Sequence, residues 1–263
     1  MGTGDNDTFV RFWWEVAAAR CRFDVSSLGE GHGSSAKWVA YNKGGSYRKW
    51  YGNQQHVLAF DKASYAVLAT QGNKLPSRQF YFLPGITWSK VSSGEPAFRW
   101  QPRGFVFDVA GNTAFSLGKF NERTVLAILN SSVTRAVLAA LAPTLNFEAG
   151  QVAKIPILPI LEESELDGLV DSLVALSRRD WDDFETSWGF ASFSLVDAPG
   201  AGLADRFGQW SRMWQALVDE AHESEDKINR LVAAAYGVAG EVDVETDPGR
   251  VSLSRTTKYA LGP

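Results

Sequence analysis

The most regular hydrophobic pattern in the chain lies in its last quarter. Apolar or small residues recur there at alternating steps of four and three, across more than four heptads: Leu203, Phe207, Trp210, Trp214, Leu217, Ala221, Ser224, Ile228, Leu231 and Ala235. This period is typical of a coiled-coil seam rather than of a helix lying on a globular core. The pattern therefore predicts a helix of roughly 50 Å, at 1.5 Å per residue.

A second helix is predicted shortly before it. Ser164 and Asp167 approximate a capping box, and an apolar face follows at helical spacing: Leu166, Leu169, Val170, Leu173 and Leu176. We expect Glu162–Ser187 to fold back on Leu203–Tyr236 as an antiparallel helical hairpin that acts as an arm or spacer. The residues from Gly237 onward are acidic and poorly periodic, which indicates a linker or tail.

The first half of the chain has shorter and less regular patterns. Asp7 is a plausible N-cap for a helix that ends near Arg20, with Phe9, Phe12, Trp13 and Val16 on its apolar face. Two runs, "HVLAF" and "RQFYFL", favour strands between turn-forming clusters, and "AFRWQPRGFVFDVAGNTAFSL" favours three more, with turns at residues 102–104 and 111–112. A helix is predicted from Asn121 to Leu141, ended by Pro143.

These elements predict an α+β fold. A mixed α/β domain covers residues 1–156, an acidic helical hairpin with coiled-coil character covers 157–237, and a linker or tail covers 238–263. No run of 18 apolar residues and no signal-peptide pattern occurs, so we expect a cytoplasmic protein without a membrane segment. The single Cys21 forms no internal disulfide, and the three histidines lack ligand spacing, so no metal site is expected.

The charge of the chain is divided unevenly. The net charge is −4, but residues 1–156 carry 17 basic against 10 acidic residues, and residues 157–263 carry 9 against 20. Between Lys37 and Arg103 ten basic residues stand against only Asp61 and Glu95, a net of +8. Such asymmetry favours an anionic partner for the first half.

The stretch "KWVAYNKGGSYRKWYGN", residues 37–53, combines this charge with aromatic residues and glycines. Gly44 and Gly45 would let backbone N–H groups approach an anion, while Lys43, Arg48 and Lys49 would neutralise phosphates. The P-loop spacing is missing. The alternative is a solvated basic loop held to the core by its aromatic residues, and spacing alone does not separate the two; the local charge favours the anionic partner.

A second polar stretch, residues 87–104, ends the basic window. Lys90, Arg99 and Arg103 would hold phosphates there, while Ser92 and Gln101 would reach base edges. A strand-turn-strand with exposed polar tips explains the same pattern, and the pattern alone slightly favours it. The acids of "RRDWDDFETSW", residues 178–188, fit a solvated helix face, and no catalytic or dinucleotide-binding motif is recognisable, so no catalytic residue is predicted.

Five blocks of the chain, taken in order, resemble the PglX family, the adenine-specific DNA methyltransferases of BREX phage-defence systems, which are related to type IIG restriction-modification enzymes. The blocks are "GTGDNDTFVRFWWEV", "KWVAYNKGGSYRKWYGN", "GITWSKVSSGEPAFRWQPRGFVFDVAGNTAF", "LNSSVTRAVLAALAPTLNFEAGQVAKIPI" and "SRRDWDDFETSWGF". In that family they lie in the target-recognition region and the helical segment after it. The resemblance implies N6-adenine methylation with S-adenosyl-L-methionine by the whole protein, with the catalytic and cofactor-binding motifs outside this chain, which would be an excised, truncated or split version.

We therefore expect this chain to recognise double-stranded DNA without being active as a methyltransferase by itself. The predicted phosphate or base contacts are Lys43, Arg48, Lys49, Arg99 and Arg103, and the predicted base-reading residues are Tyr41, Asn42, Asn53, Ser92 and Gln101. The alternative is a protein-interaction module whose helical hairpin docks other BREX subunits or a phage-encoded inhibitor.

Overall fold

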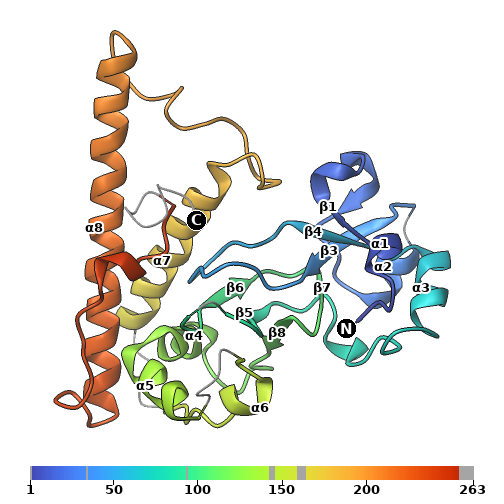
Figure 1. Ribbon diagram of the computed structural model, residues 1–263, viewed down its shortest axis with the longest axis horizontal. Helices are drawn as coiled ribbons and strands as arrows, with labels where there is room; N and C mark the ends of the chain where they lie inside the picture. The colour runs from blue at the N-terminus through green and yellow to red at the C-terminus, as the bar shows by residue number, and fades with distance from the viewer. Residues whose placement is uncertain (1, 34, 93, 142–145, 159–163, 255–263) are drawn as a thin grey trace.

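A computed structural model describes residues 2–33, 35–92, 94–141, 146–158 and 164–254 (Figure 1). Within them the chain is mixed α/β, with two small sheets and eight α-helices. The sheets and the shorter helices fill one side of Figure 1, and the long helix α8 stands at the opposite side.

The first sheet, here sheet A, has the strand order β1-β4-β3-β2, with β7 also paired to β3. Its strands are β1 (Val10–Phe12), β2 (Cys21–Arg22), β3 (Trp38–Asn42), β4 (His56–Ala59) and β7 (Phe105–Phe107). β3 is buried along its whole length and is paired on both edges. β2 and β7 follow one another along one edge, both parallel to β3, while β4 pairs antiparallel on the other.

The second sheet, sheet B, is antiparallel with the order β6-β5-β8. Its strands are β5 (Gly85–Ser89), β6 (Phe98–Gln101) and β8 (Gly111–Ala114). The turn between β6 and β7 carries the chain from sheet B to sheet A. Gly104 in this turn has φ +103, and a Cβ there would lie 2.2 Å from the carbonyl oxygen of Phe23, so only glycine fits.

Short helices surround the sheets, and two long helices follow them. They are α1 (Asn6–Phe9), α2 (Leu28–Gly33), α3 (Lys62–Leu68), α4 (Glu122–Asn130), α5 (Ser132–Leu141), α6 (Ala149–Val152), α7 (Ser164–Asp182) and α8 (Leu203–Ala235). Single 3₁₀ turns occur at Trp13–Glu15, Ala18–Arg20, Arg78–Phe80 and Pro248–Arg250.

Helix α8 has the extent that its heptad pattern predicts, 33 residues from Leu203 to Ala235. Three contacts fix its register against α7: Glu165 with Lys227, Ser172 with Glu220, and Arg179 with Met213. Each step of seven residues along α7 corresponds to seven residues back along α8. The two helices therefore run antiparallel over this length. The role of the pair as a spacer stays a prediction.

The helices share a hydrophobic core with sheet B. One cluster joins side chains of β5, β6, α4, α5, α7 and α8, and a separate cluster surrounds sheet A. The first cluster includes Trp88 and Leu126 from before residue 156 and Val170 and Val232 from after it. The domain boundary at residue 156 stays a prediction, but packing in the described residues continues across it.

The structure corrects several expected elements. The helix expected from Asp7 to Arg20 is only α1, capped by Asp5 and followed by β1, because Val10 and Phe12 pair with β4 instead. The run "RQFYFL" forms a 3₁₀ turn and no strand. The helix predicted over 121–141 bends by 65° between α4 and α5. Ser131 lies at the bend and accepts a hydrogen bond from the N–H of Thr134, at 3.4 Å; Pro143 lies outside the described residues.

The expected linker after Gly237 also differs from the structure, up to residue 254. Val251, Ser252 and Leu253 are buried, and the N–H of Thr246 donates to Asp226 of α8 at 2.6 Å. This segment thus packs as a strap along α8. Across the described residues, no single helix has the length and apolar composition to cross a membrane, although the bent pair α4 and α5 passes such a test together.

Candidate nucleic-acid interface

The loop between β3 and β4, residues 43–55, contains four of the ten predicted contact residues: Lys43, Arg48, Lys49 and Asn53. Figure 1 shows this loop reaching from sheet A toward α7. Arg48 is only 9% exposed, and its guanidinium pairs with Asp180 of α7. It also donates to the carbonyl of Tyr51 at 3.0 Å and lies 5.1 Å from the ring of Trp181. Arg48 therefore attaches the loop to α7.

Lys49 makes the corresponding attachment to α8. Its ammonium group lies 2.7 Å from one carboxylate oxygen of Glu225, and the indole N–H of Trp50 donates to the other oxygen, also at 2.7 Å. Burial by itself lowers the pKa of Lys49, but attraction to Glu225 outweighs it and raises the pKa to about 12. The N–H of Lys49 donates to Ser252 in the strap at 2.8 Å. One loop thus holds both the helix and the strap.

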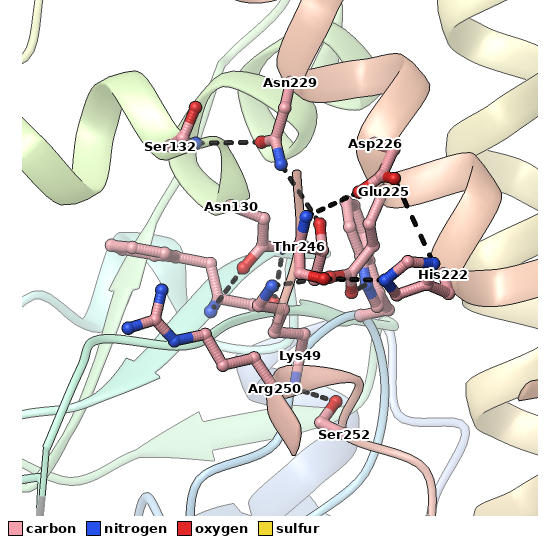
Figure 2. A network of polar contacts seen from close by, with 12 residues as sticks. Lys49, Asn130, Ser132, His222, Glu225, Asp226, Asn229, Thr246, Arg250 and Ser252 are labelled. Carbon is pink, nitrogen blue, oxygen red and sulfur yellow. Dashed lines mark hydrogen bonds and ion pairs between the residues drawn. The ribbon is translucent and has the colours of Figure 1, made fainter. Parts of the chain in front are cut away.

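Figure 2 shows the polar network in which Lys49 and Glu225 take part. Further along α8, Asn229 accepts from the N–H of Ser132 at 2.9 Å and donates to the hydroxyl of Thr246 at 3.1 Å. His222 contacts the carbonyl of Thr246 at 2.6 Å. These polar side chains of α8 connect α5, the loop and the strap.

Arg99 on β6 is 1% exposed and lies beneath the same loop. It donates to the carbonyls of Arg48 at 3.1 Å and Ala97 at 3.4 Å, while its Nε has no partner among the described residues. Burial, and after it the charge of Arg48, lowers the pKa of Arg99 to about 10. The side chain supports the backbone of the loop.

The predicted base-reading residues Tyr41, Asn42 and Gln101 lie in a buried polar layer between the two sheets. The amide of Asn42 donates to Gln101 at 2.7 Å and to Thr87, and its oxygen accepts from the N–H of Gly44 at 3.1 Å. The hydroxyl of Tyr41 donates to Asp108, and burial first, with Asp108 second, raises its pKa above the usual 10. These side chains orient the strands that carry them.

Asn53 completes the buried set, because its amide donates to the carbonyl of Ser46 at 2.8 Å. The glycine before it is also constrained, since a Cβ on Gly52 would lie 2.5 Å from Nε of Arg48. Seven of the ten predicted contact residues are therefore interior side chains in this arrangement: Tyr41, Asn42, Arg48, Lys49, Asn53, Arg99 and Gln101. In this arrangement they are buried and hold partners within the fold, which fits a structural role; their contact with DNA stays a prediction.

The other three predicted residues reach the surface. Arg103 is exposed, and Lys43 and Ser92 are half-buried. Neither Lys43 nor Arg103 forms an ion pair within the part of the chain that the structure describes. The hydroxyl of Ser92 donates to the carbonyl of Glu95 at 2.7 Å. Lys43 and Arg103 are thus the predicted cations that remain available.

Two curated relatives match almost the whole chain. The adenine-specific methyltransferase PglX of Lacticaseibacillus casei (strain Zhang) is 32% identical over 97% of the chain, and the adenine-specific methyltransferase BrxX of Escherichia coli O9:H4 (strain HS) is 28% identical over 98%. The resemblance to PglX is confirmed. The chain spans only about a fifth of the length of these relatives, 22% and 20%. No family model matches it.

In this PglX-like chain the sequence pattern did not single out a further group of basic residues around α3. Burial raises the pKa of Asp61, the N-cap of α3. Its hydrogen bonds with Ser64 and the nearby charges of Lys37 and Arg20 together outweigh burial, so the pKa of Asp61 is lowered. Arg78 lies over the ring of Tyr65 at 5.8 Å. We call this group the α3 basic region: Arg20, Lys37, Lys62, Lys74 and Arg78. The only signal for four of its members was the charge count of the window from Lys37 to Arg103, and Arg20 lies before that window.

The α3 basic region lies around α3, on the side of this PglX-like molecule farthest from α8 (Figure 1). Within the described ranges its cations form no ion pair with an acid, whereas Arg48, Lys49 and Lys90 are paired with Asp180, Glu225 and Glu148. Among those same residues, no group of three His, Cys, Asp or Glu side chains is placed to hold a metal ion.

Proposed function

We propose that this chain is the DNA-recognition segment of a PglX-like, site-specific N6-adenine DNA methyltransferase that serves BREX anti-phage defence in the cytoplasm. Methyl transfer from S-adenosyl-L-methionine is assigned to the rest of such a protein, and this chain supplies no catalytic residue. The observation that carries the proposal is the similarity to two adenine-specific methyltransferases along nearly the whole chain.

The DNA-contacting surface is the α3 basic region together with Lys43 and Arg103. This choice follows from charge and accessibility, because phosphate contacts need cations that are not already neutralised. Lys62, Lys74 and Arg103 are exposed, and Lys43 is half-buried. Base reading is assigned to Ser92, because it is half-buried while the other predicted base-reading residues are buried.

The buried residues of the loop 43–55 have a supporting part in this function. Arg48 and Lys49 hold sheet A at fixed positions on α7 and α8. Rigid support of this kind places a recognition surface at a set distance and angle from the rest of a larger enzyme. The acidic helices α7 and α8 then act as the spacer, with a charge that disfavours contact with DNA.

The proposal is tested by measuring the fluorescence anisotropy of a labelled DNA duplex over a range of salt concentrations. The wild-type chain should bind at low salt, and log affinity should fall linearly with log salt. The double variant Lys62→Glu, Lys74→Glu should flatten the slope by roughly 0.9 for each phosphate contact that is lost. The double variant Arg212→Glu, Arg230→Glu is the matched control, because it changes the net charge equally and both residues are exposed cations on α8.

Two results would count against the proposal, in different ways. Absence of binding at low salt by well-folded protein would reject DNA recognition by this chain. Equal loss of binding in the Lys62→Glu, Lys74→Glu variant and in the Arg212→Glu, Arg230→Glu control would reject the assigned surface, because it would show a response to net charge alone.

A further inference from the structure

Three aromatic rings form an exposed stack at the edge of sheet A. The rings of Phe12 and Trp14 are 4.7 Å apart and within 5° of parallel, and the half-buried ring of His56 lies 4.7 Å from that of Phe12, tilted by 33°. Trp14 is 43% exposed and Phe12 is 37% exposed. Neighbouring apolar rings that stay exposed to water often mark a binding surface, because burying them would be favourable.

The backbone holds this stack in place before anything binds. Phe12 on β1 is the direct cross-strand partner of His56 on β4, so strand register sets the contact between these two rings. The next residue, Trp13, is fixed by its indole N–H, which donates to the carbonyl of Thr186 at 2.9 Å. Trp14 meets Trp13 edge-on, at 6.0 Å and 85°. A preformed stack loses little conformational entropy when it binds a flat ligand.

The charge beside the stack favours a nucleic acid as that ligand. Tyr41 on β3 is the cross-strand partner of His56, and His56 is the partner of Phe12, so Lys43, two residues after Tyr41, follows at the same end of sheet A as Trp14. Burial lowers the pKa of His56 most; the charge of Lys43 also lowers it, whereas the charges of Asp108 and Glu15 raise it. Glu15, on the same turn, accepts the N–H of Phe12 at 2.9 Å, and Lys43 forms no ion pair among the described residues. Stacking rings next to a cation without an acid partner fit the base and phosphate of one nucleotide.

We infer that the exposed rings of Trp14 and Phe12 bind an unstacked nucleobase of the DNA, while Lys43 holds a neighbouring phosphate. The inference rests on the proposed DNA binding and extends it to a second mode of contact. Stacking is tolerant of base identity because every base has a π face. The stack therefore supplies affinity for distorted or locally opened DNA, and sequence reading is left to other groups.

The test uses two labelled duplexes that differ at one position, where one has an unpaired adenine and the other has an abasic residue. Wild-type chain should prefer the unpaired adenine by about fivefold or more, the weaker end of measured base stacking on aromatic rings. Trp14→Ala should abolish this preference, and Trp14→Phe should retain much of it. Neither should change the salt slope, whereas Lys43→Ala should reduce the slope by roughly 0.9.

Phe207→Ala is the matched control, since Phe207 is 54% exposed but lies on α8. Its preference for the unpaired adenine should equal that of the wild type, and unfolding curves should confirm that every variant is folded. If the Trp14→Ala variant keeps the preference, or if wild type shows none while binding both duplexes, the inference is wrong and the proposed DNA recognition stands. If wild type binds neither duplex, both fail.

Discussion

The pair formed by Lys49 and Glu225 gives the sharpest test of the structural role assigned to the loop. Both side chains are almost fully buried, with 8% and 3% of their surface exposed. Removal of one partner leaves an uncompensated charge in the interior, which typically costs about 3–5 kcal/mol. We expect Lys49→Met and Glu225→Gln each to lower the free energy of unfolding by about 3 kcal/mol.

The double variant separates the charge pair from other effects of the two substitutions. The amide oxygen introduced by Glu225→Gln would still accept the indole N–H of Trp50, and the thioether introduced by Lys49→Met would fill the volume of the lysine stem, so no buried charge is left unpaired. Because no charge is left unpaired, the double variant should lose no more than either single variant, about 3 kcal/mol. The coupling free energy is then about 3 kcal/mol, because independent losses would sum to about 6 kcal/mol.

Urea unfolding, followed by circular dichroism, measures the free energy of unfolding of the wild type, the two single variants and the double variant. A double variant that loses as much as the two single variants together would refute the reasoning, since it would show that the two charges do not depend on each other. The dependence of the free energy of unfolding on pH, at alkaline pH, gives a second test of the pair. Because the pKa of Lys49 is raised from 10.5 to about 12, the stabilisation is complete below pH 10.5 and is lost as the pH rises through about 12. The Lys49→Met variant should lose less stability in that window.

Three further outcomes follow from other contacts. Asp180→Asn should lower stability by about 3 kcal/mol in urea unfolding, by leaving Arg48 without its counter-charge, and should leave the salt slope of DNA binding unchanged. Gly104→Ala should lower the thermal midpoint, because it forces a Cβ to within 2.2 Å of a carbonyl and costs at least about 1–3 kcal/mol. The pKa of His56 is lowered below 6.5, chiefly by burial, so its contribution to stability is present above pH 6.5 and is lost as the pH falls. Wild type should therefore lose more stability between pH 7 and pH 5 than His56→Asn does.

The elements that the sequence predicts well are those whose pattern is long or sharply bounded. Helix α8 has the predicted extent because its seam repeats over more than four heptads, and three strands form from residue 98 to 114 as expected, although the second turn lies at residues 108–110. Near Phe12 the apolar spacing fits both a helix and an alternating strand. Pairing with β4 decides between them, and this pairing involves residues more than forty positions away.

The break at Ser131 had a local signal that the apolar periodicity concealed. Asn130, Ser131 and Ser132 form a polar step inside an otherwise apolar helix, and serine is a preferred N-cap. The side chain of Asn130 bonds to both backbone groups of Phe98 on β6, at 2.9 and 3.0 Å. The bend therefore also attaches α4 to the edge of sheet B, which a helix continuing straight through would not do.

The candidate site was harder to predict because its charges are paired across the chain. Arg48 and Lys49 resemble surface cations in their local sequence, which is rich in glycine and aromatic residues. Their acids, Asp180 and Glu225, lie 132 and 176 residues away in the acidic half. No local pattern connects such positions. The sequence around a basic side chain that joins two parts of the fold therefore looks the same as the sequence around one that binds a phosphate.

This pairing changes what the charge asymmetry of the chain means. A basic half and an acidic half in one chain attract each other, so part of the excess in each is used within the fold. Of the ten cations between Lys37 and Arg103, Arg48, Lys49 and Lys90 are paired with acids and Arg99 is buried. The other six are the ones that can neutralise phosphates, which limits the contribution of this window to the salt slope to about −5. A count of charges by sequence window therefore sets an upper limit on a nucleic-acid surface, and the buried ion pairs determine how far below that limit the surface lies.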